Sequence, residues 1–113
     1  MAATAEASAK VDDRVFKALA DSTRRAILDL LRDRARTTGE LAAEFAFSRF
    51  AVMKHLNVLV EAGLVVVRRS GRERWNHLNP VPIRQIYRRW IKPFEEKSAD
   101  LLLRLKRAAE EKK

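Results

Sequence analysis

The sequence contains no cysteine and only three glycines and three prolines among its 113 residues. The absence of cysteine excludes disulfide frameworks, thiolate zinc sites, iron–sulfur clusters and cysteine nucleophiles. The apolar run from Leu64 to Val67 is far shorter than the ~20 residues that span a bilayer. Residues 1–9 lack the charged end and the apolar stretch of a signal peptide. We therefore expect a protein of the reducing cytoplasm that is neither exported nor embedded in a membrane.

Hydrophobic residues make up 47% of the chain and charged residues 35%. This balance supplies enough apolar material for a packed interior, as is typical of globular proteins rather than of disordered ones. A chain of this length has room for a single domain with a modest core. We expect residues 1–10, which are rich in alanine, to form a flexible tail in front of it.

Positive charge is concentrated in one stretch of the chain. Lysine and arginine total 24 against 15 acidic residues, which gives a formal net charge of +9. Residues 63–92 hold eight basic residues and one acidic residue, whereas residues 1–46 hold eight of each kind. Because binding to a polyanion needs clustered charge, this distribution favours a nucleic acid as the partner over a merely basic surface.

The chain begins with two predicted amphipathic helices. Apolar side chains recur at helical spacing over residues 11–20 and again over residues 26–31. Asp21 and Ser22 can cap the second helix, which we expect to end in the polar run 33–36.

Two further helices joined by a tight turn are predicted next. Thr37 and Glu40 have the spacing of a capping box, which would open a helix of about three turns. Ser48 can cap a fourth helix that runs to Ala62, and Gly63 supplies the left-handed residue that commonly follows a helix end.

A β-hairpin is predicted directly after these helices. Residues 64–69 are rich in β-branched and basic side chains, Ser70–Gly71 favours a turn, and residues 72–78 return as a second strand. Only Glu73 offsets the four arginines near the tip, which are Arg68, Arg69, Arg72 and Arg74. Such a tip can lie along phosphates or enter a minor groove, where narrow A·T-rich DNA concentrates negative potential.

The fourth predicted helix has one packing side and one free side. On a helical wheel, the packing side carries Val52, His55, Leu56 and Leu59. The free side carries Phe50, Met53, Lys54, Asn57 and Glu61. In a major groove, lysine can reach guanine acceptors, asparagine can address adenine, and apolar side chains can contact thymine methyls. Taken alone, the segment is equally compatible with an ordinary surface helix.

A long apolar stripe occupies the last part of the chain. Pro82 suits the first turn of a helix, and apolar side chains then recur every three or four residues through Ala108. Pro93 lies inside this stretch, so we expect a bent helix or two helices. A domain this small cannot easily bury this stripe and that of the first helix within one subunit, although folding back on its own subunit is the alternative. We predict a homodimer with these interface residues: Val15, Phe16, Leu19, Ile83, Ile86, Tyr87, Trp90, Phe94, Leu101 and Leu105.

Across residues 11–110 the sequence resembles the ArsR/SmtB-type winged helix-turn-helix repressors. The matching stretches are residues 16–21 (FKALAD), 23–28 (TRRAIL), 39–42 (GELA), 48–59 and 61–65 (EAGLV), followed by the basic wing. No single stretch is diagnostic, but their order and spacing together are highly specific. The resemblance implies a mainly α fold with a small β-hairpin wing. It also implies a bacterial-type dimeric repressor that inserts residues 48–59 into the major groove and dimerises through its first and last helices.

The sequence departs from the family at informative positions. Where the family usually has glutamine and a second serine in the reading helix, this chain has Arg49 and Met53, so the family's operator sequences do not transfer. Metal-sensing members carry cysteines at positions that look like Thr37 and Gly39, or Asp and His ligands on the last helix, which here has no histidine. We expect no metal and no other cofactor.

These features together predict a regulator, and specifically a repressor, that binds double-stranded DNA sequence-specifically. Residues 11–79 would form the DNA-binding part and residues 80–113 the dimerisation helix of the same domain. We expect base contacts from Arg49, Phe50, Met53, Lys54 and Asn57. We expect phosphate contacts from Thr38 and Ser48, and wing contacts from Arg68, Arg69, Arg72 and Arg74.

Other functions differ in what they require of the sequence. Catalysis needs a nucleophile beside a base, paired carboxylates in a pocket or a phosphate-cradling glycine loop, and none is visible, so we predict no enzymatic activity. A protein-interaction module on a winged-helix fold and a non-specific nucleic-acid-binding protein remain alternatives. The sequence does not indicate an effector.

Overall fold

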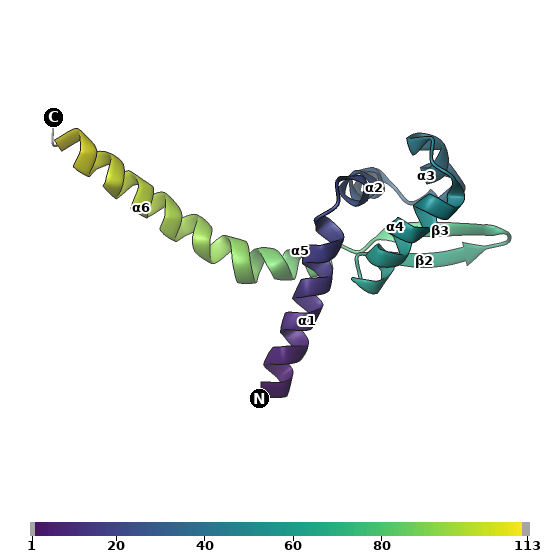
Figure 1. The fold of residues 1–113 in the computed structure, drawn as a ribbon, viewed down its shortest axis with the longest axis horizontal. Coiled ribbons are helices and arrows are strands. Elements are labelled where there is room, and N and C mark those ends of the chain that lie inside the picture. Colours follow the sequence, from purple (N-terminus) through teal and green to yellow (C-terminus); the bar gives the residue numbers. More distant parts are fainter. Residues whose placement is uncertain (1, 112–113) are drawn as a thin grey trace. The chain divides into compact units, whose positions relative to one another are not determined.

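A computed structural model of the chain describes residues 2–111. The chain divides into two compact units, Met1–Pro82 and Ile83–Lys113. In chain order, the elements that begin in the first unit are α1 (Ala2–Leu19), α2 (Ser22–Asp33), β1 (Arg36–Thr37), α3 (Thr38–Phe45), α4 (Arg49–Glu61), β2 (Val65–Ser70), β3 (Glu73–Leu78) and α5 (Val81–Ile86). The second unit continues with the π-helix η1 (Tyr87–Ile91) and the helix α6 (Lys92–Glu111). The architecture is mainly α with a small sheet (Figure 1).

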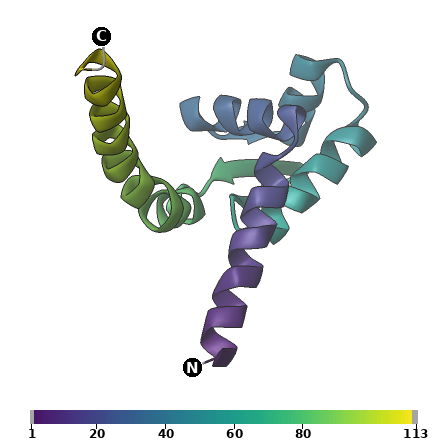
Figure 2. The same cartoon turned by 60° about the vertical axis from the view of Figure 1, so that its left-hand side comes forward.

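The first helix extends through the segment expected to be a tail. Helix α1 begins at Ala2 and runs without interruption to Leu19, as Figure 2 shows. The segment is rich in alanine, the residue with the highest helix propensity, and contains neither glycine nor proline to stop a helix. Helical propensity therefore extends the amphipathic stretch towards the N-terminus.

The three expected helix caps are confirmed. The side-chain oxygens of Asp21, Thr37 and Ser48 each accept a hydrogen bond from the backbone amide three residues later, over 3.0, 3.1 and 3.1 Å. Glu40 completes a capping box by accepting from the backbone amide of Thr37 over 3.3 Å. These bonds satisfy amide groups that have no partner inside the helix, and so fix where α2, α3 and α4 begin.

Helix α3 is shorter than expected. It has eight residues, a little over two turns, and ends at Ala46, which adopts the left-handed conformation with φ 53°. The amide of Phe47 donates to the carbonyl of Ala42 over 3.2 Å, closing the helix end. The rings of Phe45 and Phe47 stack at 5.7 Å. Because an alanine rather than a glycine takes the left-handed position, the sequence gives no signal for this stop.

The wing is part of a three-stranded antiparallel sheet of order β1-β3-β2. The two long strands pair from Val65 opposite Leu78 to Ser70 opposite Glu73. The turn is therefore Gly71–Arg72, one residue later than expected, with Gly71 at φ 62°. A two-residue hairpin loop with a positive φ at its first position matches strand twist and favours glycine there. The third strand, β1, was not predicted, because two residues are too few to show an alternating pattern.

The core of the first unit lies between its helices and its sheet. Val52, Leu56 and Leu59 of α4 are buried, as the helical wheel predicts, whereas His55 is only half-buried. They share this core with Ile27 of α2, Leu41 of α3 and Leu64 at the start of the wing, all 0% exposed. These contacts hold α4 against the rest of the unit, so its opposite side is left to solvent.

Pro93 is accommodated without ending the helical run. Residues 81–111 are helical throughout, and the turn before Pro93 is the π-helix η1, closed by the amide of Lys92 donating to the carbonyl of Tyr87. Proline lacks an amide hydrogen and its ring clashes with the carbonyl four residues earlier. A wider π turn changes that carbonyl's position and removes the conflict. The Tyr87 hydroxyl also donates to Glu95 over 2.9 Å, spanning the π segment.

Candidate nucleic-acid interface

Helix α4 presents a mixed apolar and basic face to solvent. Phe50 is 71% exposed, and Arg49, Lys54 and Asn57 are exposed as well. The Lys54 ammonium lies over the Phe50 ring, 4.7 Å from its centroid. This cation–π contact orients both side chains outward from the first turns of the helix. Met53, which was expected on the same face, is half-buried.

Helices α3 and α4 form a helix-turn-helix pair. The two helices pack against each other and are joined by residues 46–48, the last of which is the N-cap Ser48. Ser48 is exposed and Thr38, in the first turn of α3, is half-buried. The structure therefore places both expected phosphate-contacting residues at helix N-termini, where backbone amides and the helix dipole favour an anion.

The four wing arginines are divided between two faces of the hairpin. Arg69 and Arg74 are directly opposite each other in the register, as are Arg68 and Trp75. Since side chains alternate along a strand, Arg69 and Arg74 share one face and Arg68 takes the other. Arg72 lies in the turn, and the hairpin tip projects beyond the helices of the unit in Figure 1.

Arg74 differs from the expectation that it is a solvent-exposed arginine of the tip. Its side chain is half-buried, and its Nη1 donates to the Sδ of Met53 in α4 over 3.2 Å. Its Nε is buried and has no hydrogen-bond partner among the described residues. Burial lowers the pKa of Arg74, and the neighbouring charge of Arg69 lowers it further. Arg74 turns towards the helix because its strand position faces α4.

A cavity of about 420 Å³ lies between α3, α4 and the wing. Its lining includes Thr38, Glu73 and four arginines, which are Arg49, Arg69, Arg72 and Arg74. Gly39 forms part of its wall, and a Cβ placed on Gly39 would meet the Nη2 of Arg49 at 3.1 Å. The absence of a side chain at Gly39 therefore lets the Arg49 guanidinium lie against the first turn of α3.

Asn76 ties the wing to the helices, and the sequence analysis did not single it out. It is 0% exposed, and its Nδ2 donates to the carbonyl of Arg36 in β1 and to the Thr38 hydroxyl, each over 3.2 Å. Its Oδ1 has no partner among the described residues. Asparagine is usually exposed to solvent. The structural role of Asn76 becomes visible only through strand β1, which the sequence did not predict and which supplies the Arg36 carbonyl.

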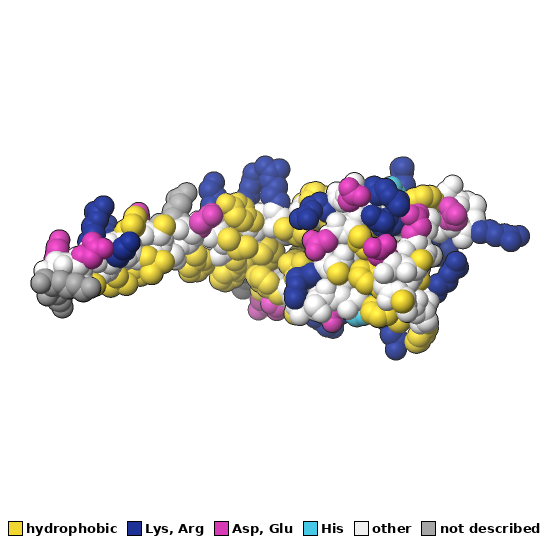
Figure 3. All heavy atoms as spheres, turned by 90° about the horizontal axis from the view of Figure 1, so that it is seen from above, with side chains coloured by type: hydrophobic (Ala, Val, Ile, Leu, Met, Phe, Trp, Pro, Cys, Tyr) yellow, Lys and Arg dark blue, Asp and Glu magenta, His cyan; other side chains and the backbone are white. Residues whose placement is uncertain are grey.

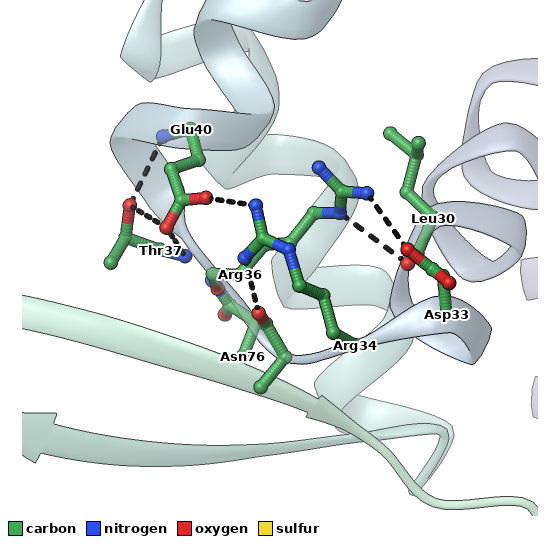
Figure 4. Close-up of polar contacts among 8 residues, drawn as sticks. Leu30, Asp33, Arg34, Arg36, Thr37, Glu40 and Asn76 are labelled. Carbon is green, nitrogen blue, oxygen red and sulfur yellow. Dashed lines mark hydrogen bonds and ion pairs between the residues drawn. The ribbon is translucent and has the colours of Figure 1, made fainter.

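Charged side chains hold the segment between α2 and α3 in place, as Figure 4 shows. The Arg36 side chain donates to the carbonyl of Leu30 over 3.4 Å and pairs with Asp33 at 3.6 Å. Arg34 donates to Glu40 over 2.7 Å. This bond, with the backbone amide of Thr37, holds the pKa of Glu40 below its usual range. The contacts position the start of α3 and hence the cavity wall.

Comparisons with known proteins place this arrangement in a family. A family described as a helix-turn-helix domain matches residues 19–68. The HTH-type transcriptional regulator YuzN of Bacillus subtilis is 42% identical over 86 residues, which cover 70% of this chain and 94% of YuzN. The transcriptional repressor SdpR of the same organism is 40% identical, with 59% of this chain and 74% of SdpR covered.

Solved structures of other proteins have a fold similar to that of this chain. An ArsR-like transcriptional regulator from Rhodococcus sp. RHA1 is 30% identical with a TM-score of 0.68, and the match covers 92% of this chain and 94% of that one. This chain belongs to the ArsR family of transcriptional regulators. A homodimeric winged helix-turn-helix DNA-binding domain from Mycobacterium bovis is 27% identical with a TM-score of 0.66, covering 84% of this chain and 83% of that one.

The histidines of this ArsR-family regulator lie on different elements. His55 Nδ1 is 3.4 Å from the Arg24 guanidinium and 3.7 Å from the carboxylate of Asp21. The amide of Arg24 lowers the pKa of Asp21 by donating to its carboxylate. Arg24 also donates to the carbonyls of Lys17 and Ala18 at the end of α1. His55 thus belongs to the junction of α1, α2 and α4. Among the side chains that the structure describes, no three His, Cys, Asp or Glu come together as metal ligands would.

The residues expected in the dimer interface differ in exposure. Val15 and Ile86 are only 1% and 4% exposed in the single chain. Leu19 is half-buried. The other expected residues are exposed: Phe16, Ile83, Tyr87, Trp90, Phe94, Leu101 and Leu105. The helical wheel missed the distinction because it shows which side of a helix is apolar and not what covers it.

The described helices include none with the length and apolar composition needed to cross a membrane.

Proposed function

We propose that this ArsR-family regulator is a repressor that binds double-stranded DNA sequence-specifically as a homodimer. The observation that carries this function is the exposed face of α4, where Phe50, Lys54 and Asn57 are open to solvent. Arg49 of the same helix lines a cavity together with arginines of the wing. A protein acting on the chromosome works in the cytoplasm of a bacterial cell, and we place the regulator there.

The exposed face of α4 carries the chemistry that base edges recognise. In the major groove Lys54 donates to guanine acceptors, Asn57 forms paired hydrogen bonds with adenine, and Phe50 contacts thymine methyls. Arg49 precedes them at the start of the helix, the end that commonly contacts bases in helix-turn-helix proteins. Met53 is half-buried against Arg74, so its contribution is to shape the helix surface and offer an apolar edge.

Phosphate contacts flank this reading surface on both sides. Ser48 and Thr38 supply hydroxyl groups at the N-termini of α4 and α3. The wing supplies exposed guanidinium groups from Arg68, Arg69 and Arg72 that lie along the neighbouring backbone. The half-buried Arg74 adds its charge from the cavity behind them. Such contacts hold the register of the protein on the duplex and contribute affinity for every sequence.

The second unit supplies a surface for dimerisation. Hydrophobic side chains run along the length of its helix, as Figure 3 shows, and Trp90, Phe94, Leu101 and Leu105 are 46–58% exposed. Exposed apolar surface of this extent marks an interaction site. The M. bovis relative is homodimeric, and a two-fold pair would present two α4 helices to successive major grooves, roughly 34–36 Å apart. An inverted-repeat operator follows from that symmetry.

Titration of the full chain on the DNA upstream of its own gene tests this function. Binding there with an affinity at least about a thousandfold above that for a scrambled duplex supports a specific regulator. Equal affinity for both duplexes indicates a non-specific nucleic-acid-binding protein, and no affinity for either indicates a protein-interaction module. Sedimentation at several concentrations tests the dimer, and a monomer at every concentration contradicts it.

A further inference from the structure

The cavity between α3, α4 and the wing combines excess positive charge with an unused hydrogen-bond donor. The side chains that line it include four guanidinium groups and one carboxylate, that of Glu73. The Nε of Arg74 is buried without a partner among the described residues. A buried donor without an acceptor is costly, and so is like charge gathered in a partly enclosed space. An anion held there by the exposed guanidinium groups would relieve the like charge.

The geometry points to a phosphate-group site in this cavity, occupied by a phosphate monoester or diester held by Arg49, Arg69, Arg72 and Arg74. The volume of about 420 Å³ falls in the range of about 300–1,000 Å³ found for small-ligand sites. Planar guanidinium groups match the oxygen spacing of phosphate and bind it in pairs of parallel hydrogen bonds. Arg49, Arg69 and Arg72 are exposed, so the cavity is open to solvent along that side.

Gly39 positions one of these guanidinium groups. The approach of Arg49 to the first turn of α3 leaves only 3.1 Å between its Nη2 and the place where a Cβ of residue 39 would stand. Because Arg49 is the first residue of α4 and Arg74 contacts Met53 in the same helix, a phosphate here touches α4 from two directions. Its occupancy therefore joins the wing, α3 and α4 around one anion.

The phosphate group can come from two sources. One is the backbone of the DNA, and this source rests on the DNA-binding function proposed above. The other is a free phosphate compound, which would stay in the cavity when DNA is bound.

Titration of inorganic phosphate into the full chain, without DNA and at constant ionic strength set with chloride, tests the site. The probes are the NMR signals of the Gly39 amide and of the Arg74 Nε–H. We expect both signals to shift saturably with one common dissociation constant, while the Arg68 Nε–H on the other face of the wing stays unchanged.

Three variants sharpen the test. Arg49→Gln removes one exposed guanidinium of the cavity and is expected to weaken phosphate binding about tenfold, the effect of losing one charge-assisted pair of bonds. Arg32→Gln removes the same charge from the exposed surface of α2, outside the cavity, and should leave the dissociation constant unchanged. Gly39→Ala keeps every charge but displaces the Arg49 guanidinium, and is expected to weaken binding several-fold.

Non-saturating shifts, or equal losses in Arg49→Gln and Arg32→Gln, would rule out the phosphate site. Addition of a short random duplex then separates the sources: displacement of phosphate from a saturable site assigns the cavity to the DNA backbone. Simultaneous binding of both assigns it to a free phosphate compound alone. A chain that recognises its operator but shows no saturable phosphate binding loses this site and keeps the proposed function.

Discussion

The Arg74 guanidinium donates to the sulfur of Met53 over 3.2 Å, and this contact joins strand β3 to helix α4. The contact removes Arg74 from solvent and lowers its pKa through burial. It leaves the Arg74 Nε without a partner among the described residues. Arg74 is thus both part of the packing behind α4 and part of the charged cavity.

Replacement of Arg74 by methionine separates these two parts. Arg74→Met exchanges a partly desolvated charge for an apolar side chain that extends to a similar distance. This variant is therefore expected to unfold at the same temperature as the native chain or a few degrees higher. Its DNA affinity should fall for every sequence, and the slope of log affinity against log salt should decrease by about one. Thermal unfolding and DNA titrations at several salt concentrations measure both. An unchanged slope would place Arg74 outside the DNA interface.

Alanine variants of α4 and of the wing should affect DNA binding in different ways. Lys54→Ala and Asn57→Ala remove base contacts, so we expect a loss of about 1–3 kcal/mol on the operator and little change on random duplex. Arg72→Ala removes a phosphate contact and should weaken both complexes alike. Competition titrations with operator and scrambled duplexes measure the ratio. A uniform loss in all three variants would mean that α4 does not read bases.

The sequence predicted most of the fold because its helix ends depend on local chemistry. Asp21, Thr37 and Ser48 cap helices through bonds that reach only three residues along the chain. The unpredicted parts depend on distant contacts or weak signals. Strand β1 exists through pairing with β3, some forty residues away, and the stop of α3 uses an alanine in a conformation that glycine normally takes.

Asn76→Ala is expected to destabilise the first unit by about 1–3 kcal/mol. Loss of the amide leaves the Arg36 carbonyl and the Thr38 hydroxyl without the donor they share, at a site that is 0% exposed. Chemical denaturation with urea gives the free energy of unfolding. The matched control is Asn57→Ala on the exposed face of α4, which should change that free energy by less than about 0.5 kcal/mol. Equal stability of both variants would contradict the role assigned to Asn76.

Acid should weaken the fold through two carboxylates. The pKa of Asp21 lies below its ordinary value of 3.8 because the Arg24 amide donates to it, and that of Glu40 lies below 4.5 because Arg34 donates to it. Since the folded state holds these protons less tightly than the unfolded state, their stabilisation is complete above the ordinary values and is lost as pH falls through the lowered ones.

The pH dependence of thermal unfolding below about pH 4.5 measures this loss. We expect a shallower decline for Asp21→Asn, which keeps a capping oxygen, and for Glu40→Gln. Asp29→Asn serves as the control because its carboxylate makes only an exposed ion pair with Arg32, at 3.8 Å. If all three variants lost stability in parallel with the native chain, the two bonds would contribute nothing specific to acid sensitivity.

The site itself was only partly predictable. A helical wheel places Phe50, Lys54 and Asn57 on the free side of α4, where the structure has them exposed, and their contact with bases stays a prediction. The wheel cannot show that Arg74 turns back towards Met53, because that depends on the register of the hairpin against α4. The same holds for Val15, whose burial depends on how α1 packs against the other helices of the first unit.

Directed cleavage of DNA from α4 tests most directly whether two such helices read one operator. The chain has no cysteine, so Glu61→Cys, at the exposed C-terminal end of α4, provides a single attachment point for an iron chelate that cuts nearby DNA. We predict two clusters of cuts in the upstream DNA of the regulator's own gene, related by two-fold symmetry and centred about 10–10.5 base pairs apart or a multiple of that spacing. Cuts spread evenly along the duplex, or a single cluster without a symmetric partner, would contradict a dimer that reads an inverted repeat through α4.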